Sequence, residues 1–261
     1  MLIIYADGIG SSVPGFTDGQ SILYKVAERL LELDPSSRAT RVQWPASMAT
    51  VGGKYSWKDA SGIGCADVNR ILHENPDEKV ILLGYSGGCR VVHEWMEYNS
   101  DKLDRIAAVG LLSDPYRPRD RKQAELLETS GWGICGEKLG PIPDRTFWTA
   151  VQADVITDAT DDSILRTAAD ASGVMPGQFL GELRNHVKEG DFQLAWQLGV
   201  FQANPLKWLL NFGIRLHEAR IDIKGYLNGR HTDDYIKPYA GGASLATRLA
   251  NSINWHVTHN K

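Results

Sequence analysis

The chain has 261 residues, of which 43% are apolar, and a net charge of −4. This length suits one elaborated α/β domain, and the apolar content is sufficient for a full core. The charge argues against a nucleic-acid surface or a polybasic membrane anchor, and no apolar run is long enough for stable membrane insertion. Three widely spaced cysteines without a Cys-x-x-Cys pair predict neither a disulfide framework nor a zinc site.

Apolar runs typical of strands alternate with helical patterns through the first 150 residues. We expect strands at residues 2–6, 41–44, 80–83, 106–112 and 147–151, and helices at 21–33, 62–75 and 91–98. This alternation predicts a mostly parallel, doubly wound sheet with helices on both faces. The chain opens directly on a strand-like run without a charged leader, so we expect synthesis in a reducing cytoplasm without a signal peptide.

Residues 163–227 break the alternation. They show several helical patterns rich in aromatic groups, and they predict an inserted cap rather than another strand–helix unit. A last helix is expected at residues 245–255. The expected organisation is therefore a core formed by residues 1–162 and 228–261, with a helical insertion between the two parts.

A Gly-x-Ser-x-Gly motif lies between a strand and a helix, as Gly-Tyr-Ser-Gly-Gly at residues 84–88. In that setting it is the nucleophile elbow of α/β-hydrolases, a turn so tight that the flanking glycines leave room for neighbouring backbone. Ser86 is therefore the candidate nucleophile. The alternative is a strand–turn–helix joint with an incidental serine.

The order along the chain in this fold is serine, acid, histidine. His231 lies in a polar loop just before the last helix, where the base is expected. The other six histidines are better read as ordinary helix, cap or terminal residues: His73, His93, His186, His217, His256 and His259.

Two aspartates compete for the role of the acid. Asp154 follows the strand at 147–151, whereas Asp114 ends the preceding strand and is the second choice. Asp158, Asp161 and Asp162 are expected to be solvated or to cap helices.

The oxyanion hole is expected to use the backbone N–H of Gly87 together with that of Ile9 or Gly10 from the first loop. Residues 8–10 begin like a dinucleotide fingerprint, but the third glycine is missing. The sequence also contains no cluster of metal-ligating residues and no phosphate-binding loop, so no metal or cofactor is expected.

Several short segments, in order, resemble the cutinases. They are Trp-Pro-Ala at 44–46, Ser56 with Gly62, the elbow at 84–88, and Ser-Asp-Pro-Tyr-Arg at 113–117. Gly-Trp-Gly-Ile-Cys-Gly at 131–136 and the helical excursion before the histidine resemble the mycobacteriophage lysin B branch of that family. The resemblance covers essentially the whole chain, although Gly87 stands where the family usually has Gln.

The resemblance implies a triad of Ser86, Asp154 and His231 in an α/β-hydrolase fold. It also implies an esterase that releases mycolic acids from arabinogalactan and acts at the host envelope after lysis begins. Aromatic side chains of the cap are candidates to line an acyl groove or simply to pack the cap: Trp196, Phe201, Trp208 and Phe212. A lipase for smaller esters and a non-catalytic envelope-binding protein remain alternatives.

Overall fold

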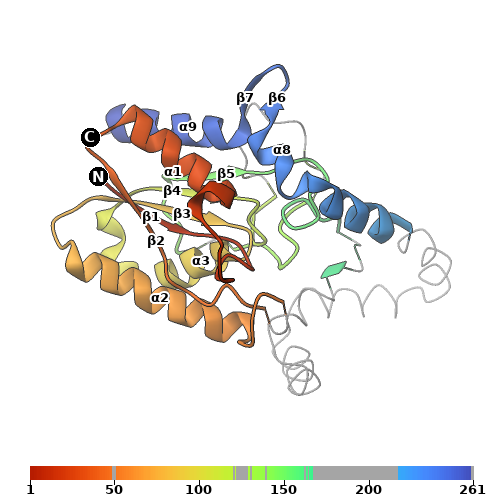
Figure 1. Ribbon diagram of the computed structural model, residues 1–261, viewed down its shortest axis with the longest axis horizontal. Coiled ribbons are helices and arrows are strands. Elements are labelled where there is room, and N and C mark those ends of the chain that lie inside the picture. The colour runs from red at the N-terminus through yellow and green to blue at the C-terminus, as the bar shows by residue number, and fades with distance from the viewer. Residues whose placement is uncertain are drawn as a thin grey trace.

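The computed structural model describes residues 1–48, 51–119, 121, 129, 131–138, 140–161, 163, 165–166 and 217–259. A five-stranded sheet forms the middle layer, and helices cover both of its faces (Figure 1). The strands pair in the order β2-β1-β3-β4-β5, and every pairing is parallel. They are β1 (Leu2–Ala6), β2 (Arg38–Arg41), β3 (Val80–Tyr85), β4 (Ile106–Leu112) and β5 (Thr146–Thr149). The predicted parallel sheet is confirmed.

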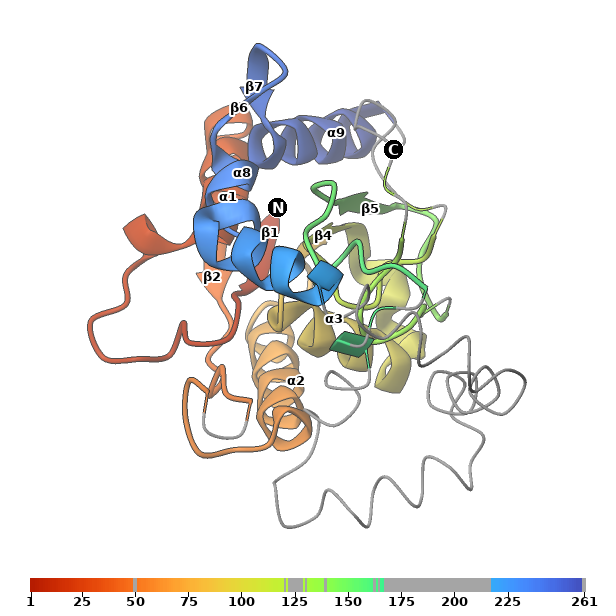
Figure 2. The same ribbon diagram turned by 90° about the vertical axis from the view of Figure 1, so that its right-hand side faces the viewer.

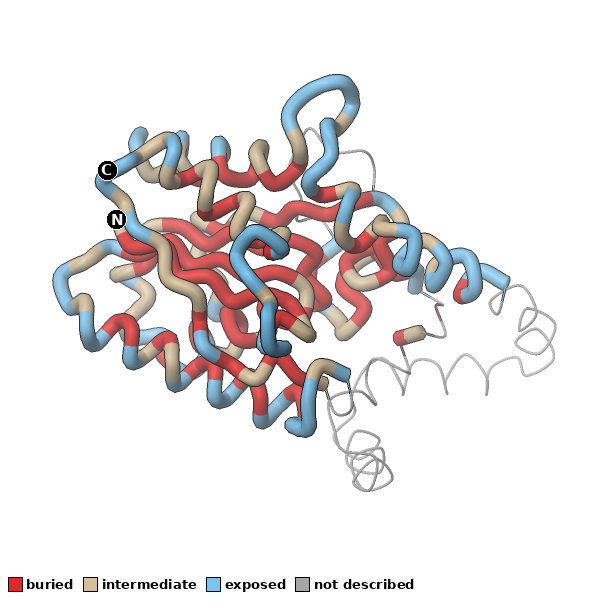
Figure 3. The backbone as a smooth tube through the Cα atoms, in the orientation of Figure 1, coloured by how far each residue is buried: buried red, intermediate tan, exposed pale blue. Residues whose placement is uncertain are grey.

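Side chains of the central strands alternate between two cores. In β1, Leu2, Ile4 and Ala6 pack beneath α2 (Trp57–Glu74) and α3 (Gly88–Tyr98). Ile3 and Tyr5 face the other core, under α1 (Ile22–Leu33) and α9 (Leu245–His259). Because both faces are buried, these strands are continuous apolar runs, which is why the sequence reveals them. Figure 2 shows the two helix pairs on opposite sides, and Figure 3 shows the buried strands between them.

The second strand was predicted three residues too late, at 41–44 instead of Arg38–Arg41. It is an edge strand that pairs only with β1, where Leu2 faces Arg38 and Tyr5 faces Arg41. The backbone ladder sets its bounds, and its side chains are only partly buried. The apolar Val42 and Trp44 are buried in the loop that follows and misled the prediction.

Helix α2 begins five residues before the predicted start at Gly62. Ser56 caps it, with Ser56 Oγ accepting a hydrogen bond from the Asp59 N–H at 3.0 Å. Gly64 lies inside the helix because α3 passes close by. A Cβ at Gly64 would lie 2.8 Å from Val91. Gly64 is therefore required by the packing of the two helices, whereas a Cβ at Gly62 would meet nothing within 4 Å.

The last predicted strand, 147–151, ends in the structure at Thr149, opposite Leu112 at the end of β4. After residue 217 the chain is helical to 225 and continues as the π-helix η3 (Tyr226–Arg230) and the short α8 (Asp233–Ile236). A small hairpin of β6 (Pro238–Tyr239) and β7 (Gly242–Ser244), which was not predicted, leads into α9. Helix α9 continues to His259, beyond the predicted end at 255.

Most of the predicted cap, 163–227, lies outside the described residues. Its described last part, residues 217–225, is helical as predicted. The division of the chain into core and cap stays a prediction. Within the part of the chain that the structure describes, no helix is long and apolar enough to cross a bilayer.

Candidate active site

Ser86 occupies the sharp turn between β3 and α3. Its φ of +50° lies in the left-handed region, which is strained for a residue with a side chain. The Ser86 N–H donates to the Leu112 carbonyl at 3.0 Å. Gly88 passes so close to β1 that a Cβ there would lie 2.1 Å from the Ala6 carbonyl oxygen. The turn therefore needs glycine at 88, and it holds the Ser86 hydroxyl clear of the sheet.

The His231 ring reaches Ser86 from the segment between η3 and α8. Its Nε2 lies 2.8 Å from Ser86 Oγ, and 4% of the residue is exposed. The Tyr85 hydroxyl donates to the His231 carbonyl at 2.7 Å, and the two rings stack with centroids 5.3 Å apart. The elbow thus fixes the histidine through the residue directly before the serine.

Asp154 lies behind His231 and is fully buried. Each of its carboxylate oxygens is 3.2 Å from His231 Nδ1. Two hydroxyls also donate to Oδ2: that of Ser113 at 2.6 Å and that of Tyr235 at 2.7 Å. Burial alone would raise the pKa of Asp154, but the charge and hydrogen bond of His231, with these hydroxyls, lower it instead. Asp154 is therefore held as a carboxylate against the imidazole.

Asp114, the alternative acid, belongs to a different buried network. Its Oδ2 lies 2.8 Å from His93 Nε2 and accepts a hydrogen bond from the Trp148 indole at 3.0 Å. Its Oδ1 accepts the Tyr116 N–H at 2.9 Å. The structure brings Asp154, and not Asp114, to His231.

Asp158 was expected to be solvated or to cap a helix, and this is wrong. It is buried and accepts the N–H groups of Gly131 and Ala153, both at 2.7 Å. Asp161 is half exposed beside Arg119, as expected. Asp162 lies outside the described residues, as does His186. Of the histidines that the structure describes, only His231 contacts Ser86.

Of the three N–H groups expected to donate to the oxyanion, two are available and one is already hydrogen-bonded. Gly87 precedes α3, and the Ile9 nitrogen lies 3.4 Å from the position of a Cβ on Gly87. Neither N–H has a hydrogen-bond partner among the described residues. The Gly10 N–H, by contrast, donates to the Ala46 carbonyl at 2.8 Å, so it is not available as a donor. Gly87 and Ile9 are the pair that the geometry offers to a developing oxyanion.

Three residues of this arrangement were not predicted from the sequence. Ser113 and Tyr235 hold Asp154, and Tyr85 holds His231. Tyr85 is part of the elbow motif and could have been singled out. Ser113 was quoted only within a family motif, and nothing around Tyr235 in the sequence points to a role.

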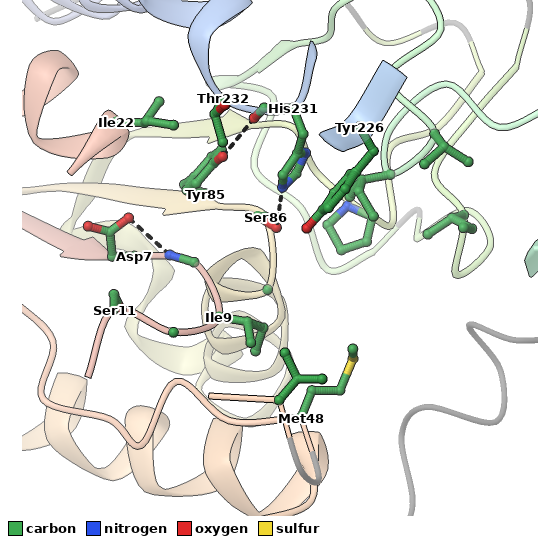
Figure 4. A pocket seen from close by; sticks show the side chains of 18 of the residues that line it. Asp7, Ile9, Ser11, Ile22, Met48, Tyr85, Ser86, Tyr226, His231 and Thr232 are labelled. Carbon is green, nitrogen blue, oxygen red and sulfur yellow. Dashed lines mark hydrogen bonds between the residues drawn. The ribbon is translucent and has the colours of Figure 1, made fainter. Parts of the chain in front are cut away.

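A cavity of about 620 Å³ opens over Ser86, and Figure 4 shows part of its wall. Ile9 and Met48 lie below the serine in that view, Tyr226 and His231 above it, and Asp7 to one side. The wall is largely apolar, with side chains from several loops and helices: Ile9, Phe16, Ile22, Met48, Val51, Trp57, Ile134, Val155, Ile156, Leu165, Ile223 and Tyr226. The aromatic residues predicted to bind substrate lie outside the described residues: Trp196, Phe201, Trp208 and Phe212.

All of these groups meet at one edge of the sheet, where the strands end. Ile9 follows β1, Ser86 follows β3, Ser113 follows β4 and Asp154 follows β5. Ser86 and Ser113, directly after β3 and β4, have φ of +50° and +52°, and Ala153, the residue before Asp154, has φ of +57°. The carboxyl edge of an open α/β sheet is where such folds place their ligands.

The comparisons with known proteins agree with this architecture. Residues 4–145 match the cutinase family. A stretch of 85 residues is 33% identical to a cutinase of Blumeria hordei, covering 30% of this chain and 36% of that protein. The match thus spans about a third of that relative's length.

Two solved structures are similar to this chain to different degrees. Lysin B from mycobacteriophage D29 has a TM-score of 0.58 at 15% identity, and the match covers 97% of this chain and 97% of that chain. A Trichoderma reesei cutinase in complex with a phosphonate inhibitor has a TM-score of 0.41 at 20% identity, over 66% of this chain and 71% of that chain. The family match covers more than half of the chain and includes Ser86, although it ends before Asp154 and His231. The chain therefore has the cutinase-like α/β-hydrolase fold and belongs to the cutinase family.

Proposed function

We propose that this protein is a serine carboxylic-ester hydrolase in which Ser86 is the nucleophile, His231 the base and Asp154 the group that orients the base. One observation carries the proposal. His231 Nε2 lies 2.8 Å from Ser86 Oγ, and its Nδ1 lies 3.2 Å from both oxygens of the buried Asp154. Nucleophile, base and acid are thus connected in the order that acyl transfer requires.

In the proposed reaction, Ser86 Oγ attacks the ester carbonyl while His231 Nε2 takes the hydroxyl proton. Asp154 keeps the proton of the imidazole on Nδ1 and stabilises the imidazolium that forms. The Gly87 and Ile9 N–H groups donate to the oxyanion. His231 then gives its proton to the leaving alcohol, and water, deprotonated by the same histidine, releases the acid from Ser86. The chemistry as proposed needs only side chains, backbone N–H groups and water.

The finer proposal concerns the substrate, which we take to be the ester between mycolic acids and arabinogalactan. Three observations support it: the segments that resemble the lysin B branch, the shared fold with a lysin B over 97% of both chains, and the largely apolar cavity wall. A long branched acyl chain gains about 0.8 kcal/mol for each methylene that the wall removes from water. Under this proposal the protein acts in phage lysis, at the host cell envelope.

Two alternative functions are consistent with some of these observations. A cutinase-like lipase would use the same three residues on smaller or soluble esters. A non-catalytic envelope-binding protein would keep the fold and the cavity without turnover. The hydrogen bond between Ser86 and His231 favours the catalytic readings, because binding alone has no need of an activated serine.

The first test is covalent labelling of the wild-type protein by a fluorophosphonate, followed by peptide mass spectrometry. Modification of Ser86, absent in Ser86→Ala and suppressed in His231→Ala, is expected for an activated nucleophile. An unlabelled wild type would favour the binding protein.

The second test separates the two enzymes. Purified mycolyl-arabinogalactan and p-nitrophenyl butyrate are incubated with the wild type and with Ser86→Ala. We expect release of free mycolic acid by the wild type alone. Hydrolysis of the butyrate without release of mycolic acid would identify the smaller-ester lipase.

A further inference from the structure

The imidazole of His231 lies between two tyrosine rings. Tyr85 covers one face at 5.3 Å between centroids and an interplanar angle of 23°. Tyr226 stacks at 4.8 Å and 22°. The two tyrosines differ in what their hydroxyls do. That of Tyr85 donates to the His231 carbonyl. The Tyr226 hydroxyl has no hydrogen-bond partner in the part of the chain that the structure describes.

The π-helix η3 places Tyr226 opposite His231. Within it, Asn228 and Gly229 leave helical geometry, and Gly229 takes a φ of +89°. A Cβ at Gly229 would lie 3.1 Å from the Asp233 side chain. The kink lets residues five apart in sequence stack face to face. A π-turn of this kind is common at functional sites.

The free hydroxyl of Tyr226 lies at the reacting centre. Tyr226 lines the cavity, and Figure 4 shows its hydroxyl end directed toward Ser86 from the His231 side. Ile9, one of the two N–H donors, lies on the other side of Ser86 in the same view. Although 40% of Tyr226 is exposed, the partial burial of its ring, followed by the charge of Asp154, raises the pKa of Tyr226, so the phenol keeps its proton at neutral and mildly alkaline pH.

We propose that the Tyr226 hydroxyl hydrogen-bonds the alcohol oxygen of the ester as it departs. The inference rests on the proposed esterase function of Ser86 and His231. In the tetrahedral intermediate the carbonyl oxygen faces Gly87 and Ile9, and the alcohol oxygen faces His231, which must protonate it. The C–O bond breaks, the alcohol oxygen takes the proton of His231 Nε2, and Tyr226 keeps its own proton. Its hydrogen bond disperses negative charge that builds up before the proton arrives.

The proposal makes Tyr226 a catalytic residue for esters of ordinary alcohols, including sugar hydroxyls. An alkyl alkoxide is a poor leaving group and needs this help. A p-nitrophenolate stabilises its own charge and does not. A hydrogen bond to a charged oxygen is typically worth one or two powers of ten in rate.

The test compares kcat/KM of Tyr226→Phe on two butyrate esters, p-nitrophenyl and ethyl, since kcat/KM reports acylation. We expect a loss of about tenfold or more on ethyl butyrate and less than about threefold on the p-nitrophenyl ester. Tyr85→Phe is the matched control, because it removes a hydroxyl from the other ring against the same imidazole. It should disturb His231 and lower both rates by the same factor. Tyr226→Leu, which also removes the stacking, should lower both rates, and ethyl butyrate the more.

An equal loss on both esters in Tyr226→Phe, or no loss on either, would overturn the inference, with the wild type still active. A wild type that hydrolyses neither ester would overturn the proposed function itself. Thermal unfolding of each variant separates these results from misfolding. The Phe variant should melt close to the wild type, because its ring remains and the lost hydroxyl has no protein partner.

Discussion

Two buried histidine–aspartate pairs lie among the residues that the structure describes, and only one of them forms a candidate site. His231 and Asp154 meet at 3.2 Å, with side chains 5% and 0% exposed. His93 and Asp114 meet at 2.8 Å, with side chains 1% and 0% exposed. By distance and burial alone, the second pair would be the better candidate.

The difference lies in what surrounds the pairs. The second nitrogen of His231 faces Ser86 and the cavity. The second nitrogen of His93, Nδ1, is buried and has no hydrogen-bond partner among the residues that the structure describes. Neither His93 nor Asp114 lines the cavity. The two pairs are thus alike in geometry and burial, and they differ in whether the histidine also reaches a serine at the cavity.

The largest expected effect is the loss of activity when the contact between Ser86 and His231 is removed. Ser86→Ala and His231→Ala should each lower kcat/KM for p-nitrophenyl butyrate by about 10⁶, since nucleophile and base act as a unit. Initial rates at high enzyme concentration measure this, with far-ultraviolet circular dichroism as the fold control. A variant that keeps even one hundredth of the wild-type rate would break the assignment.

Exchanging each aspartate for asparagine compares the pairs directly. Asp154→Asn should lower kcat by about 10⁴, because an amide cannot hold the imidazole in the required tautomer. Asp114→Asn should keep kcat within about threefold and lower stability by about 1–3 kcal/mol, because its single amide oxygen cannot replace both the carboxylate oxygen that meets His93 and Trp148 and the one that accepts the Tyr116 N–H. Steady-state kinetics and urea unfolding give the two readouts. If Asp114→Asn loses the activity, the two pairs have exchanged roles.

Removing His93 should cost stability rather than rate. His93→Ala leaves the buried Asp114 without its closest partner, and a hydrogen bond to a charged group typically contributes about 1.5–3 kcal/mol. The molecules that remain folded should hydrolyse p-nitrophenyl butyrate at a rate close to that of the wild type. The exposed His73 offers a matched control, His73→Ala, whose midpoint should barely move. An inactive but stable His93→Ala would contradict this reading.

The smallest effect is on acid stability. The pKa of Asp154 is lower in the folded chain than in the unfolded chain. Its carboxylate therefore contributes stability that is complete above about pH 5 and is lost as the pH falls through the lower, folded value. The stability difference between the wild type and Asp154→Asn should shrink between about pH 5 and pH 2. Urea unfolding at several pH values measures it. A difference that stays constant over this range would argue against an ionised Asp154.

The sequence predicted the features that depend on local pattern. β1 and β4 match the predicted bounds because their apolar runs are buried on both faces. The position of Ser86 followed from a turn that only a few residues can form. Asp154 was preferred for its place after a strand, and parallel strands bring such residues to one edge.

What the sequence left out depends on contacts between distant segments. The bounds of β2 follow from its pairing with β1, and the early start of α2 follows from the cap at Ser56. Ser113 and Tyr235 reach Asp154 from 41 and 81 residues away. Tyr226 meets His231 only because η3 is kinked. No periodicity marks these residues, because their partners come together only in the folded chain.

Because the site lies at the carboxyl edge of the sheet, the opposite edge is where the protein could be attached to a support while its cavity stays accessible. The segments that enter β2, β3 and β4 lie at the opposite edge: the turns at residues 34–37 and 75–79, and the 3-10 helix η2 (Ser100–Arg105). Exposed positions there, such as Ser36 and Asp77, contribute nothing to the cavity. Exposed turns of this kind tolerate insertions and attachments. A linker fixed at either position would anchor the protein to a bead or a sensor with its cavity facing outward, away from the support.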